Sequence, residues 1–101
     1  MTIRYSPAAL EDIRNLKRYL AEEFGSAVAA KSVREVVSDI ARLKRFPNLM
    51  RPLSEKTGRE TEYQYFLCGR YSISILLNVA DVISVIRIFD GRTDYVSHIF
   101  G

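Results

Sequence analysis

Two side chains near the C-terminus, Tyr95 and His98, are of types that can transfer protons. Tyr95 and His98 are three residues apart, so a helix would place both on one face. The pKa of an unperturbed histidine lies near neutrality, which suits an acid–base role. Each residue also has a structural alternative, Tyr95 as a packed aromatic ring with a polar tip and His98 as an exposed residue near the chain end.

The single cysteine and the single histidine limit the remaining chemistry. Cys68 and His98 could form a nucleophilic pair by composition alone, but no motif surrounds either residue. One Cys and one His cannot supply a typical zinc site, and the carboxylates show no cluster at magnesium-ligand spacing. No glycine-rich phosphate loop occurs. We therefore expect no metal ion and no cofactor.

Positive charge is concentrated in residues 41–59. This segment has six basic side chains against one acidic, whereas residues 1–40 are balanced and residues 60–101 carry a net charge of −2. The basic residues of the segment are Arg42, Lys44, Arg45, Arg51, Lys56 and Arg59. Such a local field attracts nucleic acid or an acidic protein, and the alternative is a solvated helix end followed by a loop.

Length and composition indicate one globular domain. The chain has 101 residues, a net charge of +3 and 48% hydrophobic residues, which is typical of globular rather than disordered chains. No apolar run approaches the ~20 residues that span a bilayer, and the N-terminus lacks the apolar core of a signal peptide. We expect one domain over residues 1–101, in the cytoplasm and without membrane contact. Stability is modest at this size, which favours a permanent partner.

The hydrophobic pattern predicts two long helices. After a short alternating strand at residues 2–5, Ser6-Pro7 is typical of a helix start and Gly25 of a helix end. Apolar residues recur at three- and four-residue steps over residues 10–24 and 33–46, and Pro47 ends the second pattern. Because only two residues join them, the helices must form a hairpin.

A period of two replaces the helical pattern after residue 60. Residues 47–60 are predicted to be a basic loop. Residues 63–68, 71–78 and 82–89 predict strands with a turn at 78–81, and residues 93–100 predict a short helix capped by Thr93. The order β-α-α-β-β-β predicts an α+β fold. In it the helical hairpin packs on an antiparallel sheet as a two-layer sandwich, with a short C-terminal helix added.

Several short motifs occur in a fixed order along the chain. They are Tyr5-Ser6-Pro7-Ala8-Ala9-Leu10-Glu11-Asp12-Ile13, Tyr19 followed by Phe24-Gly25, Arg45-Phe46-Pro47-Asn48-Leu49 with Arg51-Pro52, Gly69-Arg70-Tyr71, and Ile86-Arg87-Ile88-Phe89-Asp90-Gly91-Arg92-Thr93-Asp94. Together they resemble the RelE/ParE toxin superfamily of type II toxin–antitoxin systems, and the long, tightly joined helical hairpin is closer to ParE. The resemblance implies a bacterial toxin that forms a hetero-oligomer with the antitoxin that neutralises it.

The resemblance leaves the target open. ParE-like members poison DNA gyrase without a demonstrated hydrolytic centre, whereas RelE-like members cut messenger RNA on the ribosome. In the second case Arg92, which matches the arginine of the last-strand motif, would act with Tyr95 and His98. Ser72 stands where the motif commonly has Arg, and Asp90 where it usually has His. Both departures argue against an efficient ribonuclease, and a non-toxic partner-binding module of the same fold is a third possibility.

We expect basic side chains to contact the target or the antitoxin. The candidates are Arg42, Lys44, Arg45, Arg51, Arg70 and Arg87. Arg87 also has a structural alternative, because it alternates with Ile86 and Ile88 and so marks the solvent side of the last strand. An antitoxin segment would lie along the helical hairpin, extend an exposed sheet edge and carry enough acidic residues to cover the basic segment.

Overall fold

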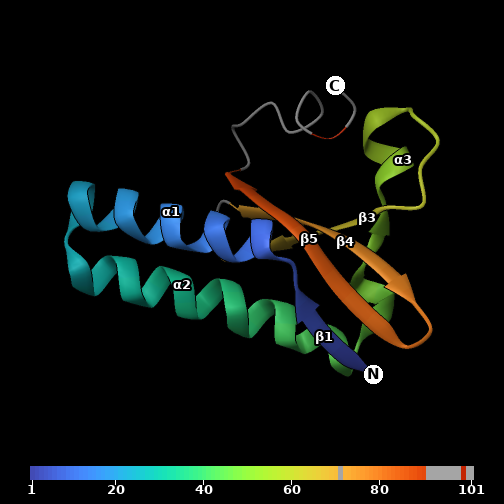
Figure 1. Cartoon of the computed structure of the whole chain (residues 1–101), viewed down its shortest axis with the longest axis horizontal. Coiled ribbons are helices and arrows are strands. Elements are labelled where there is room, and N and C mark those ends of the chain that lie inside the picture. Colours follow the sequence, from blue (N-terminus) through green and yellow to red (C-terminus); the bar gives the residue numbers. More distant parts are fainter. Residues whose placement is uncertain (71, 91–98, 100–101) are drawn as a thin grey trace.

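The computed structural model describes residues 1–70, 72–90 and 99. The elements are β1 (Thr2–Tyr5), α1 (Pro7–Phe24), α2 (Ser26–Ala41), the 3₁₀ turns η1 (Arg42–Lys44) and η2 (Pro47–Leu49), β2 (Arg51–Pro52), α3 (Leu53–Thr57), β3 (Gln64–Cys68), β4 (Ser72–Val79) and β5 (Val82–Asp90). The α+β fold with a helical hairpin on a sheet is confirmed. Figure 1 shows the hairpin along one side of the sheet, with its turn reaching beyond the strands.

The sheet is mixed rather than purely antiparallel. Its strand order is β1-β5-β4-β3-β2, and β1 runs parallel to β5 while the other neighbours are antiparallel. The prediction of an antiparallel sheet therefore holds for β2 to β5 and was wrong for β1. Short connections impose antiparallel pairing on β3, β4 and β5, whereas the helical hairpin and three strands separate β1 from β5 and leave its direction free.

Ser6 starts α1 as predicted and also ties it to the sheet. Its hydroxyl oxygen accepts a hydrogen bond from the Ala9 N–H at 3.0 Å, which caps the helix. The same hydroxyl donates to the Ile86 carbonyl at 2.7 Å. One side chain thus satisfies an orphan donor of the helix and an acceptor of β5, so α1 begins at a fixed place beside the sheet.

Gly25 forms the hairpin turn between α1 and α2. It has the predicted positive φ of 95°, but its ψ of 162° lies outside the left-handed helical region. A side chain is disfavoured there by the backbone conformation alone, because a Cβ atom at this position would have no atom of another residue within 4 Å. The predicted second helix divides into α2 and the 3₁₀ turn η1, and Pro47 begins the next turn.

The segment predicted as a loop, residues 47–60, contains the 3₁₀ turn η2 and two further short elements. Arg51 and Pro52 pair with β3, and residues Leu53–Thr57 form α3. Leu53 is fully buried, and Gly58 ends the helix in the left-handed conformation. The prediction failed because one buried leucine in a polar, proline- and glycine-containing stretch shows no periodicity.

β4 and β5 form a tight hairpin with one irregularity. Ala80 and Asp81 turn the chain with φ values of 53° and 62°, within the predicted turn. Leu76 faces Val85 and Ile75 faces Arg87, so Ile86 is the extra residue of a bulge. Its carbonyl is the one that accepts the Ser6 hydroxyl.

Hydrophobic side chains gather in two clusters. The larger lies between the helical hairpin and the sheet and contains Ala9, Val36, Ile40, Leu43, Met50, Cys68, Leu76, Ile83, Val85 and Ile88. The second contains Leu53, Ile73, Ile75 and Phe89, and Ile99 packs against it. Through Leu53, α3 therefore partly covers the second cluster. The predicted C-terminal helix lies outside the described residues apart from Ile99.

Candidate functional site

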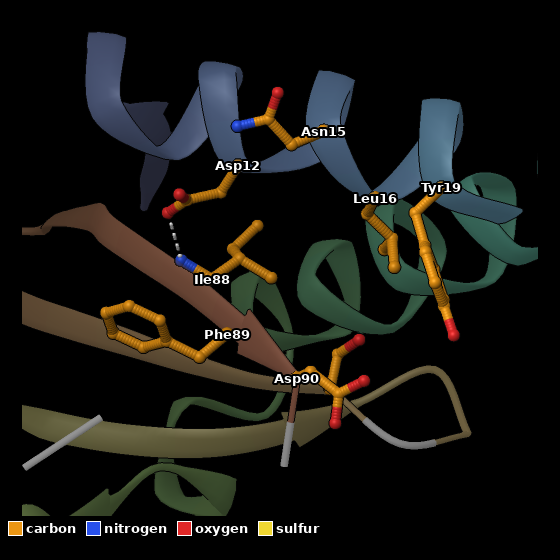
Figure 2. A pocket seen from close by; sticks show the side chains of 8 residues that line it. Asp12, Asn15, Leu16, Tyr19, Ile88, Phe89 and Asp90 are labelled. Atoms are coloured by element: carbon orange, nitrogen blue, oxygen red, sulfur yellow. Dashed lines mark hydrogen bonds between the residues drawn. The ribbon is translucent and has the colours of Figure 1, made fainter. Parts of the chain in front are cut away.

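A groove runs between α1 and the C-terminal part of β5. Its volume is about 340 Å³, and Figure 2 shows side chains from both elements turned toward it. The lining residues are Asp12, Asn15, Leu16, Tyr19, Ser72, Ile88, Phe89 and Asp90. Leu16, Ile88 and Phe89 make it partly apolar, while two carboxylates, an amide, a phenol and a hydroxyl supply polar groups.

The groove exists because β1 is shorter than β5. β1 ends at Tyr5, which faces Val85, so β1 does not cover β5 beyond that point. α1 passes there instead, and Asp12 accepts a hydrogen bond from the Ile88 N–H at 2.9 Å (Figure 2). The carboxylate thus satisfies a backbone donor that β1 does not reach.

Asp12 also holds Arg87 in place. Its carboxylate accepts hydrogen bonds from Nε of Arg87 at 2.8 Å and from a terminal guanidinium nitrogen at 2.9 Å. These hydrogen bonds raise the pKa of Arg87 above its ordinary value. The guanidinium also lies over the Phe89 ring, with 4.7 Å between its central carbon and the ring centroid. Arg87 is therefore engaged at the junction of α1 and β5, with 34% of its side chain exposed. Its role as a partner contact stays a prediction.

Ser72 and Asp90 meet at the groove. Their Cα atoms are paired across β4 and β5, and both residues line the groove. Both positions depart from the motifs of the RelE/ParE superfamily, as noted above. A hydroxyl and a carboxylate thus stand where a phosphate-binding centre would place cations. None of the described lining residues of the groove is a cationic side chain.

The remaining predicted site residues lie in different places. Arg92, Tyr95 and His98 lie outside the described residues. Arg42, Lys44 and Arg45 are exposed together at the end of α2, and Arg70 is exposed after β3. Arg51 pairs with Glu55 at 3.2 Å on the exposed edge of the sheet. The structure therefore brings three of the six predicted contact residues together and separates the other three.

Cys68 is a buried structural thiol. It is fully buried in the larger core cluster. Burial raises its pKa to about 12, the hydrogen bond with Ser74 lowers it somewhat, and the nearby Asp39 carboxylate raises it. Burial, with a further contribution from Cys68, likewise raises the pKa of Tyr5 to about 12. A thiol that keeps its proton is a poor nucleophile, so a role in nucleophilic chemistry finds no support.

Sequence reasoning missed the side chains that assemble this region. By sequence, Asp12 is distinguished by its place in the first motif and near the start of a helix, but neither feature indicates a contact with the last strand. Asp39 belongs to no motif. Asp39 accepts a hydrogen bond from the Gly69 N–H at 2.7 Å and so attaches the turn after β3 to α2. In each case the available signal was an acidic residue next to the apolar stripe of an amphipathic helix.

The comparisons with known proteins agree with this architecture. The sequence model described as the ParE toxin of the type II toxin–antitoxin system, parDE, matches residues 3–95. The chain therefore belongs to the ParE toxin family of type II toxin–antitoxin systems. A search of curated proteins found no matching sequence.

A solved structure shares the fold. It is a chain of the chromosomal ParDE toxin–antitoxin system from P. aeruginosa, with a TM-score of 0.76 and 17% sequence identity. The match covers 89% of this chain and 95% of that chain.

Within the described residues, no helix is long and apolar enough to cross a membrane.

Proposed function

We propose that this chain inhibits bacterial growth by poisoning DNA gyrase through protein–protein contact, and that a cognate antitoxin neutralises it by direct binding. Membership of the ParE toxin family supports the toxin role and a cognate antitoxin. The gyrase target rests chiefly on the pairing of Ser72 with Asp90 beside the groove. A hydroxyl and a carboxylate there favour contact with a protein over stabilisation of a cleaving phosphodiester.

The antitoxin partner accounts for exposed features of the helical hairpin. Tyr19, Phe24 and Val28 are large hydrophobic side chains that remain exposed near the hairpin turn. The α1–α2 turn extends beyond the sheet (Figure 1). An amphipathic antitoxin segment laid along the hairpin would cover these side chains and give a cytoplasmic hetero-oligomer.

Controlled expression in a bacterial host that lacks the antitoxin tests the proposed target. We expect growth arrest with a DNA-damage response and without new messenger RNA ends, and we expect co-expression of the antitoxin to restore growth. New ends within translated frames, without damage signalling, would instead support a ribosome-dependent ribonuclease. Arg92, Tyr95 and His98 would then be the first residues to substitute. Neither effect at strong expression would indicate a non-toxic binding module.

Purified components test the mechanism directly. Gyrase, supercoiled DNA and the toxin should yield cleaved DNA held in covalent complexes with gyrase, and antitoxin added before the toxin should prevent this. The R92A/H98A double variant is the matched control, because it removes two groups that the ribonuclease mechanism needs. If Arg92 and His98 do not belong to a nuclease centre, we expect the variant to poison gyrase as the wild type does.

A further inference from the structure

Cationic and apolar side chains share one exposed surface where α2 ends. We call it the α2-end surface and define it by Arg42, Lys44, Arg45, Phe46 and Leu49, all of which are exposed. Phe46 is 49% exposed and Leu49 39%. Leu43, within the same turn, is fully buried and attaches the surface to the core.

The backbone holds this surface in a compact shape. The N–H groups of Arg45 and Phe46 both donate to the Arg42 carbonyl, at 3.1 and 3.0 Å. The Leu49 N–H donates to the Phe46 carbonyl at 3.1 Å, which joins η1 to η2. The Arg45 guanidinium carbon lies 5.9 Å from the centroid of the Phe46 ring. The backbone that carries these side chains is thus fixed before any partner binds, and the Arg45 guanidinium already lies over the Phe46 ring.

The cationic side chains of the α2-end surface differ from three other arginines of the chain in their salt bridges. Arg14, Arg51 and Arg87 each have a carboxylate partner within 3.2 Å. Within the described residues, no carboxylate forms a salt bridge with Arg42, Lys44 or Arg45. Basic residues near a helix C-terminus interact favourably with the helix dipole, typically by about 0.3–1 kcal/mol each. That effect explains a basic residue here but not the exposure of Phe46 and Leu49 beside it.

We propose that the α2-end surface binds an acidic segment of the antitoxin in which carboxylates flank an apolar side chain. This inference rests on the proposed function and specifies one contact within it. Carboxylates would pair with the three cations, and the apolar side chain would pack on Phe46 and Leu49. A nucleic acid would use the cations equally well, but one phenylalanine beside a leucine offers little stacking surface for successive bases.

Charge reversal tests the inference. The R42E/K44E/R45E variant should bind the purified cognate antitoxin about tenfold more weakly at low salt, since three lost pairs at about 0.5 kcal/mol each amount to about 1.5 kcal/mol. Its affinity should also depend less on salt than that of the wild type. The matched control is R4E/K56E/R59E, which makes the same change in net charge at exposed positions outside the hairpin and the α2-end surface. Titration calorimetry at two or more salt concentrations gives both quantities.

The apolar part of the α2-end surface is tested by a separate variant. F46S should weaken antitoxin binding severalfold while leaving its salt dependence unchanged, because no charge is altered. Circular dichroism melts show whether each variant is folded, and K44E alone serves if the triple variant is not. Affinity and salt dependence that match the wild type, or equal losses in R42E/K44E/R45E and R4E/K56E/R59E, would overturn the inference.

Other outcomes separate this inference from the proposed function. If the wild-type chain does not bind the antitoxin at all, the proposed neutralisation itself fails. If R42E/K44E/R45E keeps its antitoxin affinity but loses binding to a fluorescent single-stranded oligonucleotide, the surface is a nucleic-acid site. That result would overturn the inference and leave the toxin–antitoxin pairing intact.

Discussion

At the scale of single residues, Asp12 joins secondary structures that are far apart in the sequence. Its carboxylate accepts hydrogen bonds from the Arg87 guanidinium and from the Ile88 N–H, 75 and 76 residues away. Only 13% of the Asp12 side chain is exposed. Removing it would leave a partly buried arginine and a backbone donor without their acceptor, which is more costly than losing an exposed ion pair.

We therefore predict that D12A lowers the free energy of unfolding by about 2–3 kcal/mol. The control is E11A, which removes the neighbouring salt bridge between Glu11 and Arg14. Both of those side chains are more than half exposed, so E11A should change stability by less than about 1 kcal/mol. Urea unfolding monitored by circular dichroism measures both variants. Equal effects would show that Asp12 does not anchor α1 to β5.

Cys68 makes stability depend on alkaline pH. An unburied thiol releases its proton near pH 9, whereas the buried Cys68 keeps it until about pH 12. Between these values the unfolded chain binds fewer protons than the folded chain, so stability falls as pH rises. The Tyr5 hydroxyl, whose pKa is also raised to about 12, acts in the same direction above pH 10.

We predict that the free energy of unfolding falls by about 1.3 kcal/mol between pH 8 and pH 10 through Cys68 alone. C68A should be less stable at pH 8 but should show a smaller fall over the same range, with the Tyr5 contribution remaining. Denaturant unfolding at the two pH values, in the presence of a reductant, measures the difference. An identical pH dependence in wild type and C68A would contradict the assigned burial.

At the scale of elements, the turn after β3 is fitted to α2. Gly69 has a φ of 62°, and a Cβ atom there would lie 2.9 Å from a γ-methyl group of Val36. Val36 is itself buried in the larger core cluster. The Gly69 N–H donates to Asp39, so this turn is fixed to α2 by a close contact and by a hydrogen bond.

We predict that G69A costs about 2–4 kcal/mol, because it combines an unfavourable backbone conformation with a steric clash. The control is G58A, where φ is 72° but no atom lies within 4 Å of the added Cβ. That variant should cost about 1 kcal/mol, the conformational part alone. Thermal or urea unfolding gives the comparison, and equal costs would mean that the contact with Val36 relaxes freely.

The elements also show how far local patterns reach. The start of α1, the hairpin turn at Gly25 and the turn between β4 and β5 were predictable because capping residues and short connections act locally. α3 was not predictable from the sequence. Its single buried leucine, Leu53, is explained only by its packing against side chains of β4 and β5. Regular alternation along the last strand could not reveal the bulge at Ile86, which gives the Ser6 hydroxyl its acceptor.

At the scale of the whole molecule, the charged side chains of the groove and of the α2-end surface lie in two separate regions. The groove beside α1 and β5 has two carboxylates among its lining residues, whereas the α2-end surface carries three cations. The larger core cluster lies between the hairpin and the sheet, while Leu53 and Ile99 belong to the second cluster. The Asp12 carboxylate of the groove is already engaged by the Arg87 guanidinium.

The sequence by itself determined the helical hairpin, the succession of strands along the chain, the family resemblance and the position of the basic segment. These follow from residue periodicity, capping residues, short motifs and charge count, which need no knowledge of distant contacts. Only the tertiary structure decided the parallel pairing of β1, the groove, the engagement of Arg87 by Asp12 and the meeting of Ser72 with Asp90. The physical reason is that these features depend on which backbone and side-chain groups still lack a partner once the sheet has assembled. The bonds that satisfy them join residues as many as 80 positions apart.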